Sequence, residues 1–212
     1  MLAAKGGADP ESNFKLRVAI DRARADSMPK DNIERAISKA TTEAANIQEI
    51  MYEGFGPGGI GVLVEAATDN KNRTAQEMKN IFEKGGGSLG SPGAVSYNFE
   101  SKGFLLVKKS SDVDSQTLSL IDMGAEDIVE SEDGLEVYVA PDKLGEIKKK
   151  AEAAGLTISE MELQMKPKNL TSVSNPEEAG KAIKFLETLE EADDVQKVYS
   201  NLDIPEEVVA QI

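Results

Sequence analysis

Two glycine-rich stretches of this chain have the spacing GxGxxG, which could bind a phosphate. They run from Gly54 to Gly59 (GFGPGG) and from Gly85 to Gly90 (GGGSLG). A dinucleotide-binding turn follows a strand and opens a helix, so that the phosphate meets the helix N-terminus. Here the first stretch precedes a strand-like run, Ile60–Ala66, and the second follows a helical pattern and precedes a strand. The first is therefore interpreted as a strand–strand turn with glycine at positive φ and the second as a helix C-cap followed by a flexible loop, and neither as a nucleotide site.

Carboxylates are the other groups that could do chemistry, because the chain contains no histidine and no cysteine. Imidazole general bases, Ser-His triads, thiolate nucleophiles and metal sites built on imidazole or thiolate are thereby excluded. Asp112 with Asp114, and Glu130 with Glu132 and Asp133, could bind Mg²⁺. Both groups flank expected strand ends or turns, where acidic residues are common without a catalytic role. We expect no catalytic residue, no metal site and no cofactor.

Residues 13–40 are predicted to form two helices with basic edges. Each half carries an apolar stripe with helical spacing, and Met28-Pro29-Lys30 separates them, since proline disfavours helical geometry in the preceding residue. Asp31 is expected to cap the second helix. The candidate nucleic-acid-binding residues flank the first stripe or lie at the tip of the hairpin: Lys15, Arg17, Arg22, Arg24, Met28 and Lys30. The alternative interpretation is a solvated helix rim with an ordinary turn.

The charge distribution favours the same region for a nucleic-acid contact. The net charge is −14, yet residues 1–48 carry eight Lys or Arg and seven Asp or Glu, whereas residues 49–212 carry 16 and 31. An acidic surface repels a phosphate backbone, so nucleic acid is expected at the first segment. The acidic remainder either serves solubility or docks a basic protein.

The pattern of elements predicts an α+β protein with an N-terminal helical domain and two ferredoxin-like α/β domains, one inserted in the other. Residues 1–48 form the helical domain. Residues 102–166 have the order βαββαβ, with a hairpin turn at Asp133-Gly134. Residues 49–101 supply ββαβ, and residues 167–212 supply the helix and strand that complete the domain into which 102–166 is inserted.

Three local patterns make sharper predictions. Asn175 followed by Pro176 predicts the start of a helix over residues 176–190. Thr74 with Glu77 predicts a capping box for the helix that ends at Gly85. The alternation of apolar and polar residues over Ala94–Phe99 predicts a strand.

No apolar run approaches the ~18 residues of a membrane span, and the N-terminus MLAAKGGADPESN lacks the apolar core of a signal peptide. The absence of cysteine fits a reducing compartment. We expect a soluble cytoplasmic protein without a membrane partner. The sequence does not define an oligomeric state.

Three stretches resemble the YebC family of bacteria, whose relatives include the mitochondrial translational activator of cytochrome c oxidase subunit one. They are NFKLRVAIDRARADSMPKDNIERAI (Asn13–Ile37), YEGFGPGGIGVLVEAATDNKNRT (Tyr52–Thr74) and GGSLGSPGAVSYNFESKG (Gly86–Gly103). The similarity extends over the whole chain, more loosely after residue 104. It implies a helical first domain followed by two α/β domains, one inserted in the other. Family members usually begin with a Lys/Arg-rich segment upstream of the position of Met1, so this sequence is expected to lack the most basic part of that surface.

The resemblance also implies a role in gene expression and no enzyme activity. Family members are described as DNA-binding transcriptional regulators and as ribosome-associated translation factors. The implied partner is therefore nucleic acid, either rRNA or tRNA on a ribosome or DNA. The alternative is an acidic protein-interaction module that does not contact nucleic acid. A carboxylate enzyme using Mg²⁺ is the third hypothesis.

Overall fold

The computed structural model describes residues 8–25, 27–43 and 47–212; the side chains of residues 14, 15, 25 and 39–43 lie outside the description. The chain divides into two compact units. Unit 1 gathers residues 3–41 and 101–165, and unit 2 gathers residues 42–100 and 166–212. The α+β class is as expected. The division into three domains stays a prediction.

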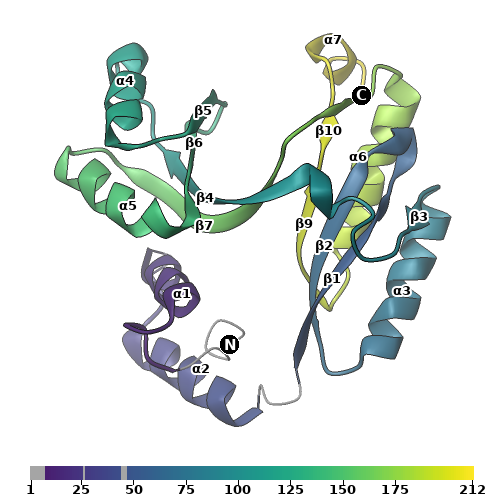
Figure 1. Ribbon diagram of the computed structural model, residues 1–212, viewed down its shortest axis with the longest axis horizontal. Coiled ribbons are helices and arrows are strands. Elements are labelled where there is room, and N and C mark those ends of the chain that lie inside the picture. The colour runs from purple at the N-terminus through teal and green to yellow at the C-terminus, as the bar shows by residue number, and fades with distance from the viewer. Residues whose placement is uncertain (1–7, 26, 44–46) are drawn as a thin grey trace. The chain divides into compact units, whose positions relative to one another are not determined.

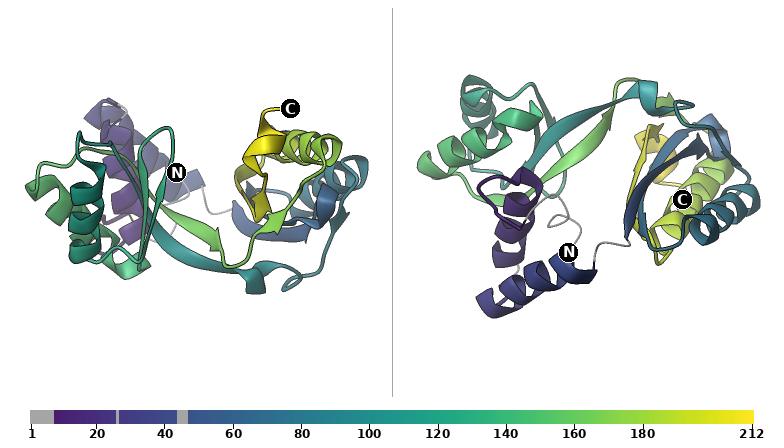
Figure 2. Two further views of the ribbon diagram at one scale, coloured as in Figure 1. Left: turned by 90° about the horizontal axis from the view of Figure 1, so that it is seen from above. Right: turned by 60° about the horizontal axis from the view of Figure 1, so that its bottom comes forward.

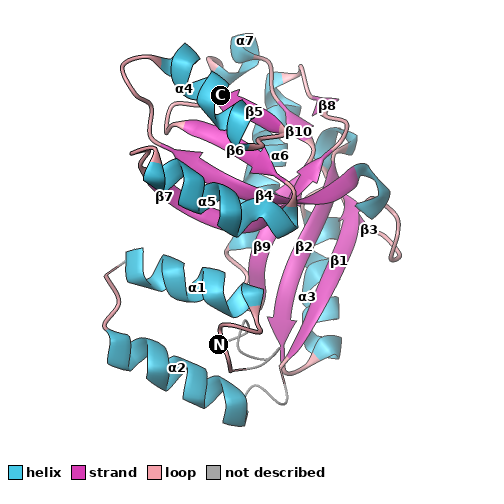
Figure 3. Ribbon diagram, turned by 60° about the vertical axis from the view of Figure 1, so that its left-hand side comes forward, coloured by secondary structure: helices cyan, strands magenta, loops and turns pink. Residues whose placement is uncertain are grey.

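Unit 1 begins with a helical hairpin, which Figure 3 shows as two successive helices joined by a short turn. Helix α1 spans Phe14–Ala25 and helix α2 spans Lys30–Glu43. The side chain of Asn13 accepts a hydrogen bond from the amide of Leu16 at 3.1 Å and so caps α1. Leu16 and Ile20 of α1 and Ile33 of α2 are buried, as the apolar stripes predict, but Ala19 of the first stripe is exposed.

The rest of unit 1 is a four-stranded sheet with two helices (Figure 1). In chain order its elements are β4 (Phe99–Val107), α4 (Val113–Met123), β5 (Asp127–Glu130), β6 (Leu135–Val139), α5 (Leu144–Ala153) and β7 (Ile158–Pro167). The strand order is β5-β6-β4-β7, which is the split βαβ arrangement expected from the βαββαβ pattern. Gly134 has φ 159 in the turn between β5 and β6, where the sequence predicts a hairpin.

The core of this sheet forms from the inward positions of β4 and β6 and from one face of each helix. Leu105 lies opposite Val137 in the antiparallel β4–β6 pair, and both are fully buried. Leu120 of α4 and Ile147 of α5 pack against them. Burial of aliphatic side chains of this size stabilises the fold by about 1.5–3 kcal/mol each.

Unit 2 contains a second four-stranded sheet with the order β3-β1-β2-β9, and a short parallel pair, β8 with β10. Its elements are β1 (Gln48–Phe55), β2 (Gly61–Thr68), α3 (Lys71–Lys84), β3 (Ser88–Leu89), β8 (Thr171–Ser172), α6 (Pro176–Glu190), β9 (Val195–Ser200), β10 (Leu202–Asp203) and α7 (Glu206–Val209). The chain order of the sheet and its two helices is ββαβαβ. This is the order that residues 49–101 and 167–212 predict, and it differs from the βαββαβ order of the sheet in unit 1.

Helices α3 and α6 cover one face of the unit 2 sheet, and Figure 2 shows them side by side. The rings of Phe82 in α3 and Phe185 in α6 meet edge to face, with centroids 5.1 Å apart. Val62 and Val64 of β2 complete this core, and both are fully buried. Segments far apart in sequence thus share one core.

The first glycine-rich stretch ends β1 and turns into β2, as expected; the second begins as the C-cap of α3, as expected, but continues into the short strand β3 instead of a loop. Gly58 and Gly59 have φ values of 73 and 74 between β1 and β2, and Gly86 has φ 82 directly after α3. Neither stretch opens a helix of more than one short turn. Glycine is needed at these positions because other residues rarely adopt positive φ.

Of the three local predictions, one is confirmed and two are wrong. Asn175 caps α6 by accepting hydrogen bonds from the amides of Glu177 and Glu178, which confirms that prediction. The capping box at Thr74 is wrong: α3 starts earlier, and Asn70 caps it by accepting from the amide of Arg73. An asparagine four residues before Thr74 is itself a strong cap, and the helix therefore begins directly after it.

The predicted strand over 94–99 is also wrong. Residues Ser96–Asn98 form a single 3-10 turn, and β4 starts only at Phe99. Val95 and Phe99 are buried as alternation requires, but the residue between them with the same parity, Tyr97, is 72% exposed. The tight turn rotates Tyr97 out of the face that its neighbours share.

Candidate nucleic-acid interface

The turn between α1 and α2 carries Met28, one of the candidate site residues. The amide of Ser27 donates to the carbonyl of Arg24 and the amide of Met28 donates to the carbonyl of Ala23, which closes α1. Ser27 takes φ 59, the left-handed conformation common at helix ends. Met28 is 45% exposed in the resulting turn. Ser27 and Met28 are therefore tied by their amides to the last turn of α1.

Lys30 is the first residue of α2, one residue before the expected cap. The carbonyl of Pro29 accepts from the amides of Asn32 and Ile33, so the helix is already under way at Lys30. The prediction that Asp31 is the cap is therefore wrong; proline has pre-set the backbone angle at the helix start. The Lys30 side chain is 81% exposed and lies 3.4 Å from the Glu34 carboxylate, one helical turn on.

Arg24 lies at the C-terminal end of α1, where its guanidinium is 3.8 Å from the Asp21 carboxylate and 65% exposed. A cation at this end also suits the helix dipole. Together with Met28 and Lys30 it forms what we call the turn patch: Arg24, Met28 and Lys30. These three of the predicted site residues come together at one end of the hairpin.

Arg17 is held by the chain that precedes α1. Its guanidinium donates to the carbonyls of Pro10 at 3.0 Å and Glu11 at 2.8 Å, and it lies 3.7 Å from the Glu11 carboxylate. Two donors of the guanidinium thus serve local structure. Arg17 does not belong to the turn patch.

Arg22 is paired within unit 1. It donates to Oε2 of Glu162 in β7 at 3.2 Å, while the other carboxylate oxygen of Glu162 accepts from Gln164. The neighbouring Asp21 accepts from Lys148 of α5, also at 3.2 Å. In one pair α1 supplies the cation and in the other it supplies the carboxylate. Both pairs join α1 to elements more than a hundred residues away in sequence. Lys15 lies in α1, but its side chain is outside the described residues.

Sequence reasoning did not single out Arg35, which is exposed on α2. At 100° per residue it lies about 140° around the helix from Lys30, so it does not extend the turn patch. The sequence could have indicated that Arg35 is exposed, because it lies opposite the apolar stripe of α2.

The loop after the second glycine stretch carries backbone amides that could have bound an anion, but a side chain of the protein already occupies them. Oε1 of Glu53 accepts from the amide of Gly93 at 2.9 Å, and Oε2 accepts from the amides of Val95 and Ser96 at 3.0 and 2.9 Å. Burial alone would raise the pKa of Glu53, but these hydrogen bonds outweigh it and the pKa is lowered. The carboxylate fills the place that a phosphate would need.

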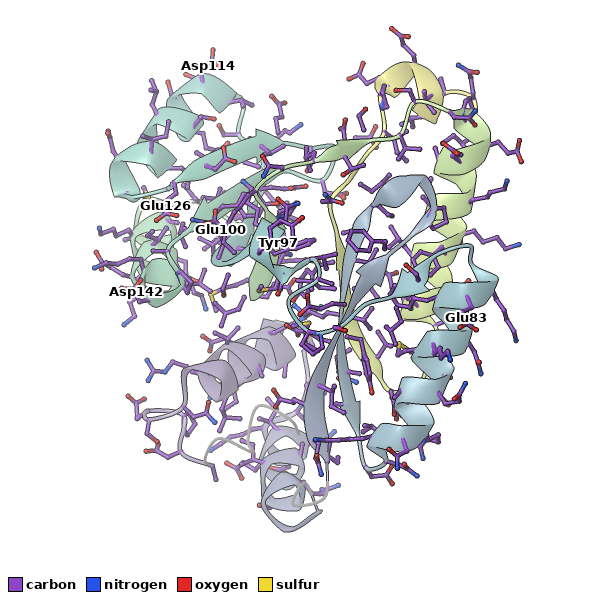
Figure 4. All side chains as sticks on the ribbon, turned by 45° about the vertical axis from the view of Figure 1, so that its right-hand side comes forward. Glu83, Tyr97, Glu100, Asp114, Glu126 and Asp142 are labelled. Carbon is purple, nitrogen blue, oxygen red and sulfur yellow. The ribbon has the colours of Figure 1, made fainter. Side chains whose placement is uncertain are left out.

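One of the acidic groups considered as a Mg²⁺ ligand, Asp112, has a structural role. Asp112 caps α4 by accepting from the amide of Ser115 at 3.0 Å, and that hydrogen bond lowers the pKa of Asp112. Figure 4 labels Asp114, Glu126 and Asp142 on the surface of the acidic segment 102–166.

Within the described residues, no group of three or more His, Cys, Asp or Glu side chains is arranged to hold a metal ion. No helix in the described part of the chain is long and apolar enough to cross a bilayer.

Comparison with known proteins gives consistent matches over the chain. Residues 1–43 match the model of the TACO1/YebC protein N-terminal domain, and residues 47–202 match that of the TACO1/YebC second and third domain. A probable transcriptional regulatory protein of Dictyoglomus turgidum is 45% identical over 217 residues, which cover 100% of this chain and 87% of the relative. One of Thermotoga maritima is also 45% identical, over 99% of this chain and 84% of the relative.

A solved structure has the same fold. The crystal structure of a conserved hypothetical protein from Aquifex aeolicus superposes with a TM-score of 0.87 at 42% sequence identity, covering 96% of this chain and 86% of the other. With the family models matched over nearly the whole length, the chain belongs to the TACO1/YebC family.

Proposed function

We propose that this chain is a gene-expression regulator that contacts nucleic acid through the turn patch of Arg24, Met28 and Lys30. The observation that supports the proposal is the joint exposure of two cations and a methionine where α1 ends and α2 begins, with Ser27, Met28 and Pro29 hydrogen-bonded to the two helices. The names of its relatives as probable transcriptional regulatory proteins support the regulatory part.

The ion pairs of the turn patch do not compete strongly with a phosphate. Lys30 with Glu34 is an exposed pair, and in the Arg24–Asp21 pair the guanidinium is exposed while the carboxylate is half-buried and also accepts from Lys148; each pair joins residues three or four positions apart. Such pairs contribute about 0–1 kcal/mol, because water screens them and both side chains lose freedom. A phosphate can therefore replace the carboxylate at little cost. Met28 adds an apolar and adaptable contact for a sugar or base.

RNA in the translation machinery is the favoured partner over duplex DNA. A DNA-reading helix inserts one face into the major groove and presents base-reading side chains there. In α1 the basic positions Arg17 and Arg22 are engaged within unit 1, so a contact limited to the turn is expected. Residues 49–212 are strongly acidic, which disfavours wrapping by a duplex.

The test is the double substitution Met28→Ser with Lys30→Gln. Both side chains are exposed, so the thermal midpoint should stay nearly unchanged, while affinity for RNA should fall about tenfold through loss of one phosphate contact and one apolar contact. Fluorescence anisotropy with labelled RNA and DNA of equal length measures this. The matched control is Lys181→Gln on α6, an exposed lysine that is also paired with a glutamate four positions away. Equal affinity of the double variant and the wild type would rule the patch out.

Sedimentation of the protein with ribosomes separates the two versions of the proposal. Association with ribosomes, lost in the double variant, supports translation. Sequence-selective binding to promoter DNA without ribosome association supports transcription instead. The proposal assigns the chain no catalysis, and calorimetric binding of Mg²⁺ at millimolar concentration would reopen a carboxylate enzyme.

One observation favours the alternative, a protein-interaction module. Helix α4 exposes Leu118 and Ile121, at 64% and 51%, beside Asp114 and Asp122. An apolar pair with an acidic rim suits a basic partner protein. Under this alternative, high salt would release a bound protein while nuclease treatment would leave it in place.

A further inference from the structure

Tyr97 is exposed for a reason that lies in the backbone. It keeps 72% of its surface in solvent, more than Leu118 at 64% or Leu170 at 61%. The 3-10 turn Ser96–Asn98 directs it outward between the buried Val95 and Phe99. An aromatic ring at such exposure contributes little to the core of unit 2. The packing of the core therefore does not explain why an aromatic residue stands at this position.

The backbone on both sides of Tyr97 is firmly held. Before it, the Glu53 carboxylate accepts from the amides of Val95 and Ser96. After it, the carbonyl of Asn98 accepts from the amide of Lys168 at 2.7 Å, and the Asn98 side chain exchanges hydrogen bonds with Asn169. The ring therefore projects from a fixed turn, so little backbone freedom would be lost when it binds a partner.

A cation and a second apolar side chain accompany the ring. The ammonium of Lys168 donates to the carbonyl of Tyr97 itself at 3.0 Å, which holds the charge close to the turn. Leu170, two residues on, is 61% exposed. All three residues belong to unit 2. Figure 4 labels Tyr97 among the side chains of this region.

From this arrangement we infer that Tyr97 and Lys168 form a second nucleic-acid contact, in which an unpaired base of single-stranded RNA stacks on the Tyr97 ring and its phosphate meets Lys168. The inference rests on the proposed function and adds a site to it, in the other unit of the chain. An exposed ring beside a cation is the combination by which proteins hold single strands without reading their sequence.

The neighbouring amides indicate that the contact does not select a base. The Oδ1 atom of Asn98 accepts from the backbone and the side chain of Asn169, and the Nδ2 of Asn98 donates to the carbonyl of Asn169. These groups are occupied by each other and are not aimed at a base edge. A duplex, whose bases are stacked and paired, offers no face to the ring. Single-stranded RNA should therefore be preferred over duplex RNA of equal length.

The test uses the full chain, single-stranded oligo(A) and three substitutions of Tyr97. Tyr97→Leu keeps an apolar side chain but removes the ring, and should weaken binding about tenfold, the usual effect of one lost base stack. Tyr97→Phe keeps the ring and should bind like the wild type. Tyr97→Trp places a single tryptophan in a chain that has none, and its fluorescence should be quenched by oligo(A) but not by duplex RNA.

Two further variants complete the experiment. Lys168→Gln should reduce the slope of log K against log salt by about 0.7, the contribution of one phosphate on a single strand. Val129→Ala, an exposed apolar residue on β5, is the matched control and should change nothing.

Three results would count against the inference. If Tyr97→Leu binds as tightly as the wild type while Met28→Ser with Lys30→Gln binds less, the second contact is refuted and the proposed function stands. Unquenched tryptophan emission from the Tyr97→Trp variant under saturating oligo(A) would refute stacking in the same way. If the wild type and every variant fail to bind RNA even at low salt, the proposed function fails together with this inference.

Discussion

At the scale of single residues, the glutamate of the YEGFGPGG stretch is a buried carboxylate that needs hydrogen-bond donors around it. Glu53 is 7% exposed, and its carboxylate accepts three backbone hydrogen bonds from the loop that carries Tyr97. A buried charge is tolerated only when its hydrogen-bonding capacity is met in this way. The same carboxylate fixes the loop and removes its amides from any contact with an anion.

We predict that Glu53→Gln lowers the free energy of unfolding by about 2 kcal/mol at neutral pH, since hydrogen bonds to a charged acceptor are stronger than those to an amide. The pKa of Glu53 is lower in the folded chain than its ordinary value of about 4.3. Its contribution is therefore complete above about pH 4.3 and is lost as the pH falls through the folded pKa. Urea unfolding of both proteins at a series of pH values measures the difference.

The matched control for this prediction is Glu83→Gln on α3, an exposed glutamate in the same unit, labelled in Figure 4. Its substitution should change the free energy of unfolding little. A difference between wild type and Glu53→Gln that stayed constant down to about pH 3, well below the ordinary glutamate pKa, would show that the effect is steric rather than electrostatic.

At the scale of elements, the glycines of GFGPGG serve packing as well as turning. A side chain at Gly54 in β1 would fall on the ring of Phe82 in α3 and within 2.5 Å of the carbonyl oxygen of Ser88. We predict that Gly54→Ala lowers the free energy of unfolding by about 1–3 kcal/mol, the usual cost of overpacking a core. Thermal unfolding by circular dichroism measures the change.

The comparison is Gly180→Ala in α6, where the nearest atom to an added Cβ is on the side chain of Ile212, at 3.3 Å. That residue is 54% exposed and can move. This substitution should raise the free energy of unfolding by up to about 1 kcal/mol, because alanine favours the helix. Equal effects of the two substitutions would contradict the packing role of Gly54.

The sequence predicted those elements whose signals are local. The βαββαβ order of unit 1 and the cap of α6 at Asn175 depend on spacing and on residues within one turn of each other, and both are as expected. The turn at Ser96–Asn98 did not follow from the alternation around it. It depends on the carboxylate of Glu53, more than forty residues earlier in the chain.

The candidate site shows the same limit. That basic residues border the α1–α2 hairpin could be seen from helical spacing alone. That Arg22 is engaged by Glu162 could not, because the two residues are 140 positions apart and only the folded sheet brings β7 to α1. Tyr97 was missed because an expected strand gave it a buried face.

At the scale of the whole molecule, the two units each have a hydrophobic core, but net negative charge is concentrated in residues 49–212. Each unit has a core of its own, one around Leu105 and Val137 and the other around Phe82 and Phe185. The positive charge available to a polyanion is confined to a few positions, whereas residues 49–212 hold 31 Asp or Glu against 16 Lys or Arg. Any affinity for nucleic acid must therefore arise from local contacts that overcome general repulsion.

We therefore predict that the chain of 212 residues binds RNA or DNA weakly, with a dissociation constant of about 10⁻⁴ M or higher at physiological salt. A Lys/Arg-rich segment attached before Met1 should tighten binding by at least about tenfold and steepen its salt dependence, because each added phosphate contact releases counterions. Fluorescence anisotropy at several salt concentrations measures both quantities, with an uncharged Gly/Ser segment of the same length as the control. If the basic and the uncharged segments give the same affinity and slope, the cations of the turn patch do not bind nucleic acid and only keep the hairpin surface hydrated. The protein-interaction alternative based on α4 then explains the molecule better.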